Sequence, residues 1–183
     1  GALKQQQLEF SGVGAHHQNG VAERAIKTVV TWGRAMLLHQ MLHWPDEFDA
    51  ANWGLALDHA VYLYNRMPNP HHGHAPLELF TGTKFNSYNV LQNTRVWGSV
   101  CYVLDPKLQD GKKLPKWNPR SRRGMFVGYD PEHGNNVGNI LNLTTGAISP
   151  QYHVVYDEQF GSVASAGVDM DEFSPEMWTQ LVR

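Results

Sequence analysis

The chain has 183 residues, 42% of them hydrophobic, which is enough to bury the core of one medium domain or two small ones. Its 17 acidic and 15 basic side chains nearly cancel, so overall charge neither favours nor excludes a nucleic-acid partner, and only local clusters can argue for one. The single cysteine, Cys101, excludes an internal disulfide framework and a cysteine-based zinc finger, and no apolar run reaches the 18 residues or so of a membrane span.

The N-terminal part is predicted to be a loop that leads into a long helix. The first ten residues, GALKQQQLEF, lack the apolar region of a signal peptide, and we expect the chain to be cut from a longer protein. Residues 11–20 carry three glycines and several polar residues, which predicts a mobile loop. Apolar side chains then recur at helical spacing from Val21 to about Leu42, with Asn19 or Gly20 as the cap.

One stripe of this helix is charged. Glu23, Lys27 and Arg34 share a helical face, and Arg24 follows Glu23 directly. A carboxylate beside cations suits a metal-dependent enzyme that acts on a phosphate backbone. It is equally typical of a solvated helix, in which the helix dipole stabilises Glu23 and Lys27 pairs with it. Because two-metal chemistry needs several carboxylates, the spacing alone does not establish catalysis.

A second helix is predicted to begin at Pro45, since proline suits the first helical position, and to end near Arg66. Its residues are apolar on most sides, which predicts deep packing that includes Trp44 and Trp53. Pro76–Phe80 is expected to add one more helical turn after a loop rich in histidine and proline.

The histidines and one acid–histidine pair are interpreted as structural. Asp58 and His59 are expected to form a buried or edge hydrogen-bonded pair within the second helix. No carboxylate or cysteine is spaced to complete a tetrahedral metal site with the loop histidines, so we expect no zinc. These loop histidines are His16, His17, His71, His72 and His74.

After about residue 93 the sequence indicates a small antiparallel β module. Short segments rich in β-branched and aromatic residues alternate there with Gly, Pro and Asn clusters. The predicted strands are Val96–Leu104, Gly124–Tyr129, Val137–Leu143 and Gln151–Tyr156. Trp97 fits the core of this module. We place a domain boundary near residues 85–95 and expect a loose tail from Gly161.

The segment between the first two predicted strands is basic. A cationic cluster of this kind binds phosphates without sequence preference and with strong salt dependence. It can equally be a solvated loop, because lysines are ordinary surface residues. The cations are Lys107, Lys112, Lys113, Lys116, Arg120, Arg122 and Arg123; Asp105 and Asp110 oppose them, and Trp117 lies inside.

Several blocks of the chain, in order, resemble integrases. HQNGVAER is similar to the segment that carries the last catalytic acid of DDE-type integrases, in particular those of Copia-type LTR retrotransposons. YNRMPNPHHGHAPLELFTGTKF resembles the stretch that follows the catalytic core of that family. VWGSVCYVL, RSRRGMFVGYD and TTGAISPQYHVVYDE resemble successive parts of its small C-terminal domain. The resemblance covers roughly residues 8–160, and the matching positions in the first block are Gln18, Asn19, Gly20, Glu23 and Arg24.

The resemblance implies an α+β fold in three parts. Residues 1–90 would be the helical C-terminal part of an RNase H-like core, residues 91–160 a small SH3-like antiparallel β-barrel, and residues 161–183 a flexible tail. It implies that the parent performs Mg²⁺- or Mn²⁺-dependent DNA 3′-end processing and strand transfer, with Glu23 as a catalytic residue and metal ligand. The residues implied to bind nucleic acid are Gln18, Asn19, Arg24, Lys27, Arg34, Lys112, Lys113, Lys116, Arg120, Arg122 and Arg123.

The same comparison exposes a gap. The family's other two catalytic aspartates lie upstream of the glutamate, and no aspartate precedes Glu23 here, so we expect this chain alone to be inactive and to hold no metal tightly. The expected partners are DNA and, through the core, further copies of the integrase, with no small-molecule cofactor and no membrane. The expected location is the nucleus and cytoplasm. The alternative is an inactive remnant or a domesticated DNA- or protein-binding module; a stand-alone hydrolase has little support because no acid–base set is complete.

Overall fold

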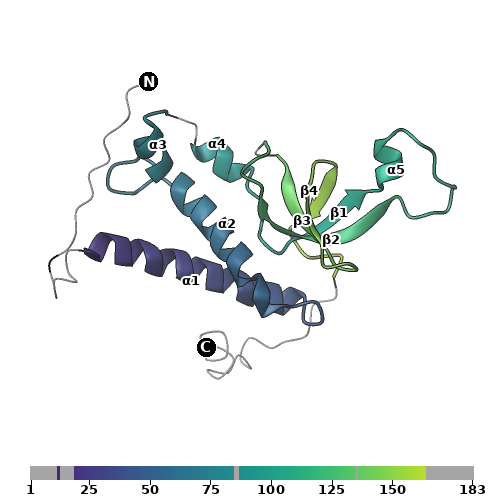
Figure 1. Cartoon of the computed structure of the whole chain (residues 1–183), viewed down its shortest axis with the longest axis horizontal. Coiled ribbons are helices and arrows are strands. Elements are labelled where there is room, and N and C mark those ends of the chain that lie inside the picture. Colours follow the sequence, from purple (N-terminus) through teal and green to yellow (C-terminus); the bar gives the residue numbers. More distant parts are fainter. Residues whose placement is uncertain (1–11, 13–18, 85–86, 135, 164–183) are drawn as a thin grey trace.

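The computed structural model describes residues 12, 19–84, 87–134 and 136–163, in which helices pack beside a β-sheet (Figure 1). Predictions for Gln18, for most of the loop at residues 11–20 and for the tail beyond residue 163 fall outside this part. The elements are α1 (Gly20–His43), η2 (Ala50–Asn52), α2 (Trp53–Arg66), α3 (Pro76–Thr81), α4 (Ser87–Gln92), β1 (Val100–Leu104), α5 (Pro106–Gln109), β2 (Ser121–Tyr129), β3 (Gly138–Asn142), β4 (Ile148–Gln151) and β5 (Val154–Asp157). None of the described helices is long and apolar enough to cross a membrane.

Helix α1 confirms the first predicted helix to within one residue at each end. Asn19 occupies the N-cap position, although its side chain makes no capping hydrogen bond. Gly33 lets α1 approach α2 closely, because a Cβ at this position would lie 2.8 Å from the Cδ2 atom of Leu57. The small residue thus sets where the two long helices contact one another.

Helix α2 begins at Trp53, so the predicted start at Pro45 is wrong. The residues from Pro45 to Glu47 form a turn instead. The start signal lies at Asp49, whose Oδ1 accepts a 2.8 Å hydrogen bond from the backbone N–H of Ala51 and caps the short helix η2. This capped turn leads directly into α2. An aspartate that satisfies an otherwise free N–H is the stronger start signal.

Two side-chain predictions for α2 are also wrong. Trp53 is 60% exposed, because apolar residues surround this helix whereas α1 and the sheet cover only part of it. His59 is buried and Asp58 is exposed, and no hydrogen bond among the described residues joins them. Successive residues of a helix project in different directions, so neighbours in sequence rarely pair. Trp44 and Trp97 are buried, as predicted, but Trp97 packs with Leu37 of α1 and Ala56 of α2 rather than in the core of the β module.

The β module is an open sheet of five antiparallel strands in the order β4-β3-β2-β1-β5. The expected barrel is therefore not closed, since β4 and β5 each pair with a single neighbour. The last predicted strand, Gln151–Tyr156, corresponds to β5, and β4 precedes it as a strand that was not predicted. Pro150 lies in β4, an edge strand, where a missing N–H donor is tolerated.

Helices and sheet share a hydrophobic core. Trp44 follows α1 and packs with Val100, Met125 and Val127 of the sheet, and Phe160 closes this cluster. The helical segment and the sheet are thus joined by buried contacts. The described residues before β1 form helices and no strand, and the RNase H-like core remains a prediction.

Candidate nucleic-acid interface

The basic segment forms an arm, defined here as residues 105–120, which connects β1 to β2. Its base is closed by the pairing of Leu104 with Ser121 and by a 2.9 Å hydrogen bond from the N–H of Asp105 to the carbonyl oxygen of Arg120. Asp105 Oδ1 also accepts a 2.8 Å bond from the N–H of Lys107, which caps α5. The arm extends beyond the sheet, at the opposite end of the molecule from the start of α1 (Figure 1).

The arm presents five exposed cations, Lys107, Lys112, Lys113, Lys116 and Arg120. Its two carboxylates offset this charge only in part. Asp105 is engaged in the helix cap, and Asp110 pairs with the Nζ atom of Lys112 at 3.4 Å. Within the part of the chain that the structure describes, the other four cations make no ion pair. They are therefore available to neutralise phosphates.

A tight turn places Lys116 and Trp117 on the surface of the arm. The N–H of Asn118 donates a 3.1 Å hydrogen bond to the carbonyl oxygen of Pro115 and closes this turn. Trp117 is 90% exposed, and the Nζ atom of Lys116 lies over its ring, 5.6 Å from the ring centroid. Sequence reasoning gave Trp117 no role. The flanking proline and asparagine residues were the signal that this tryptophan lies in a turn.

Arg122 and Arg123 are consecutive residues of β2, so their side chains point to opposite faces of the sheet. The guanidinium of Arg123 pairs with Glu47 Oε1 at 3.4 Å and lies 5.4 Å from the ring centroid of Trp44. Arg122 is half-buried. Arg123 is thus ion-paired, unlike the four free cations of the arm, and the contact of both arginines with nucleic acid stays a prediction.

The charged stripe of α1 lies in the first turns of this helix. Glu23, Arg24 and Lys27 are exposed. The ion pair between Glu23 and Lys27 that a solvated helix would favour is not among the ion pairs of the described residues. Arg34 lies eleven residues after Glu23, or roughly 16 Å along the axis, and is half-buried. The structure therefore brings Arg24 and Lys27, but not Arg34, close to the carboxylate.

The described residues do not make up a two-metal centre. None of their His, Cys, Asp and Glu side chains form a group of three or more that could hold a metal ion. Glu23 contributes a single carboxylate at the exposed start of α1, whereas two-metal chemistry needs several. Its role as a metal ligand is thus a proposal about the complete parent.

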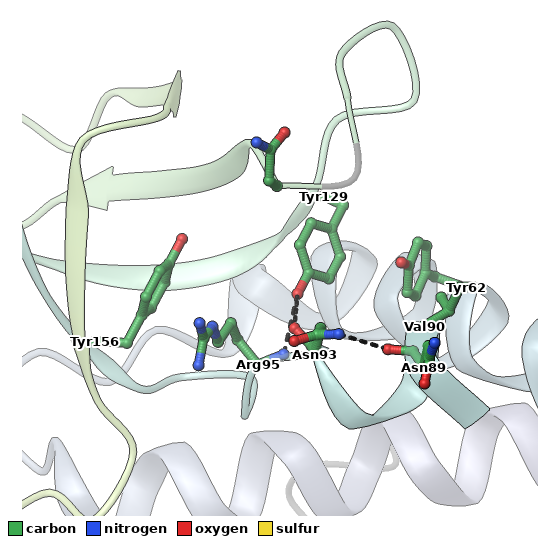
Figure 2. Close-up of a pocket in the computed structure, with 8 residues that line it drawn as sticks. Tyr62, Asn89, Val90, Asn93, Arg95, Tyr129 and Tyr156 are labelled. Carbon is green, nitrogen blue, oxygen red and sulfur yellow. Dashed lines mark hydrogen bonds between the residues drawn. The ribbon is translucent and has the colours of Figure 1, made fainter. Parts of the chain in front are cut away.

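A tyrosine-lined pocket lies where α2, α4 and the sheet meet (Figure 2). Tyr129 lies between Tyr62 and Tyr156, and its hydroxyl points to the backbone below (Figure 2). This hydroxyl accepts a 3.0 Å bond from the N–H of Arg95 and donates a 3.5 Å bond to the carbonyl oxygen of Asn93. Burial raises the pKa values of Tyr129 and Tyr156, so both hydroxyls stay protonated at neutral pH.

Arg95, which lines this pocket, is held by an ion pair and by a ring contact. Arg95 Nη1 pairs with Glu158 Oε1 at 3.0 Å, and its guanidinium carbon lies 4.9 Å from the ring centroid of Tyr156. We interpret the pocket as a junction that holds α4 against the sheet. Sequence reasoning missed it because α4 was not predicted and the lining residues come from distant segments.

Comparisons with known proteins point to the Pol polyproteins of retrotransposons. Residues 99–166 match the profile of the family described as the retroviral polymerase SH3-like domain. The chain is 32% identical over 142 residues to the retrovirus-related Pol polyprotein from transposon RE1 of Arabidopsis thaliana, which covers 76% of this chain and 8% of that polyprotein. It is 28% identical over 142 residues to the polyprotein from transposon RE2 of the same plant, covering 77% of this chain and 9% of the relative.

A third relative comes from another plant. The chain is 34% identical over 120 residues to the retrovirus-related Pol polyprotein from transposon TNT 1-94 of Nicotiana tabacum, covering 65% of this chain and 8% of the polyprotein. No solved structure shows a significant match. The chain thus spans less than a tenth of the length of these curated relatives. Together the similarities support a retrotransposon Pol region with a match to the retroviral polymerase SH3-like domain at residues 99–166.

Proposed function

We propose that this chain is part of a retrotransposon integrase and that its arm binds DNA. The supporting observation is the set of exposed cations on residues 105–120, four of them outside any ion pair of the described residues. Such a patch neutralises backbone phosphates and releases their counterions, so it binds without sequence preference and loses affinity as salt rises. The near-zero net charge of the whole chain does not oppose this, because the arm concentrates its positive charge.

The proposed activity of the complete parent is DNA 3′-end processing and strand transfer. Glu23 would supply one metal ligand, and the upstream aspartates of the family would supply the others. Bound Mg²⁺ or Mn²⁺ would activate the attacking oxygen and stabilise the leaving oxygen. The exposed cations Arg24 and Lys27 would hold phosphates in position beside this centre. The resemblance of the segment around Glu23 to the last catalytic segment of DDE-type integrases supports this proposal.

The DNA-binding proposal is tested by titrating a labelled blunt duplex with the full 183-residue chain at several salt concentrations. Fluorescence anisotropy should show a linear fall of log affinity with log salt. The triple variant Lys112→Gln, Lys113→Gln, Lys116→Gln should bind more weakly, with the slope reduced by about 0.9 for each lost phosphate contact. A triple variant with the wild-type slope would contradict the proposal.

A matched pair of single variants controls for the loss of one positive charge. Lys113 and Lys84 are both exposed lysines, but Lys84 lies between α3 and α4 rather than in the arm. Lys113→Gln should weaken duplex binding measurably, whereas Lys84→Gln should leave it close to wild type. Equal effects of the two changes would show that net charge, and not the arm, drives binding.

A further inference from the structure

Trp117 is the most exposed of the large apolar side chains in the described part of the chain, at 90%. Tryptophan is usually well buried, because its large ring gains much free energy on leaving water. Trp44 and Trp97 follow this rule at 1% and 2% exposure. An indole held in water therefore points to a ligand that covers it.

The surroundings of Trp117 indicate what kind of ligand this is. The Pro115–Asn118 turn holds the indole on the same arm as the free cations, with Lys116 directly beside it. The ring is 90% exposed, with the Nζ atom of Lys116 over it at 5.6 Å, so a planar group has room to lie against the uncovered part of the ring. An aromatic platform within a cationic groove or arm is the arrangement that binds nucleic-acid strands, since phosphates contact the cations while bases stack on the ring.

We propose that Trp117 stacks on an unpaired DNA base, so that the arm binds unpaired nucleotides more tightly than closed duplex. The inference rests on the proposed DNA binding and adds a preference that the cations alone cannot produce. Inside a duplex each base face is covered by its neighbours, so a blunt duplex offers only the outer faces of its two end pairs, whereas each frayed, overhanging or single-stranded base presents a free face. The lysines contact phosphates of either form, whereas the indole distinguishes them.

The test compares three labelled DNA probes of matched length: a blunt duplex, the same duplex with a short 3′ overhang, and oligo(dT). The wild-type chain should bind the overhang duplex more tightly than the blunt one. Trp117→Ala should lose about fivefold or more in affinity for oligo(dT) and for the overhang duplex, and less than about twofold for the blunt duplex. Trp117→Tyr should retain most of the preference because a tyrosine ring also stacks.

Phe80→Ala is the matched control. Phe80 is 82% exposed and lies on α3, away from the arm, so its removal should change none of the three affinities. Trp117→Ala should keep the wild-type circular dichroism spectrum, because the lost side chain is outside the core. A Trp117→Ala variant that loses affinity equally for all three probes, or for none, overturns the stacking inference.

The two proposals fail in different ways. If the wild type binds DNA with a salt slope that the triple lysine variant reduces, the arm binds DNA whatever Trp117 does. If Trp117→Ala then leaves the preference for unpaired bases unchanged, only the stacking inference is wrong. If the wild type binds none of the probes, both proposals are wrong.

Discussion

The indole nitrogen of Trp44 donates a 2.8 Å hydrogen bond to the carbonyl oxygen of Gly98, and this buried contact ties the end of α1 to the start of the sheet. Trp44 is 1% exposed and packs in the core that the helices and the sheet share. The hydrogen bond satisfies a carbonyl oxygen that the indole otherwise shields from water. Removing the donor while keeping an aromatic ring should therefore destabilise the folded state.

Trp44→Phe should lower the free energy of unfolding by about 1–3 kcal/mol, since the Gly98 carbonyl loses its partner and the smaller ring leaves space. Urea denaturation followed by circular dichroism measures this change. Trp53→Phe is the control, because Trp53 is 60% exposed, and it should shift the unfolding free energy by less than about 0.5 kcal/mol. Equal losses from the two variants would contradict the structural role of Trp44.

Folding stability should fall as pH drops below about 6.5. Burial lowers the pKa of His59 to about 4, against a smaller opposing effect of its hydrogen bond with the backbone of Arg95. The unfolded chain therefore binds a proton that the folded chain excludes between these two pH values. The stability contribution of neutral His59 is fully present above pH 6.5 and falls by roughly 3 kcal/mol towards pH 4.

Urea midpoints at pH 7, 5.5 and 4.5 measure this dependence. Burial also lowers the pKa values of His39 and His43, so they act in the same direction. His59→Gln should make the fall with pH shallower, although the variant starts less stable at pH 7. His153→Gln is the matched control for the substitution itself, since His153 is exposed. An unchanged pH dependence in His59→Gln would show that this group does not cause it.

Gly124 of β2 cannot carry a side chain without displacing its neighbours. A Cβ there would lie 2.7 Å from Cγ2 of Ile140 and 2.8 Å from the carbonyl oxygen of Leu141. Gly124→Ala should cost about 1–3 kcal/mol of stability through overpacking. Gly54→Ala should instead increase the stability of the fold. Nothing lies within 4 Å of a Cβ at this position in α2, and alanine favours a helix over glycine by up to about 1 kcal/mol. Thermal unfolding of both variants checks the contrast.

Glu23→Gln should abolish strand transfer by a full-length parent integrase that contains the upstream aspartates. The exposed position of Glu23 means that the change should leave folding intact, as thermal unfolding can verify. Duplex binding by the present chain should stay within about twofold, because the arm lies at the other end of the molecule (Figure 1). Measurable strand transfer by the variant would refute the catalytic assignment.

The alternative of a domesticated binding module makes a different prediction for the same parent. An inactive remnant would show no strand transfer even with Glu23 in place, while its arm would still bind DNA with the same salt dependence. Comparing the unmodified parent with Glu23→Gln thus distinguishes loss of a catalytic group from absence of catalysis. The binding experiment on the arm does not depend on this outcome.

Sequence patterns over a few residues predicted the elements that such patterns define, which are helix α1 and most of the sheet. Apolar spacing placed α1 to within one residue at each end, and β-branched and aromatic segments located the regions that form the sheet. The start of α2 was misplaced because Pro45 and Asp49 both resemble helix starts, and only one forms a cap. Helix α4 was missed because its six residues give too short a pattern to recognise.

The sequence by itself determined that cations and a tryptophan cluster between two strands, since that follows from their order along the chain. Only the tertiary structure decided which of these side chains are exposed and outside any ion pair of the described residues. Arg120 and Arg123 are three residues apart, yet strand pairing keeps Arg120 at the base of the arm and places Arg123 against Glu47. Trp44 is buried because residues distant in sequence pack around it, whereas Trp117 is exposed on the arm. Burial depends on contacts between residues distant in sequence, and no local pattern contains those contacts.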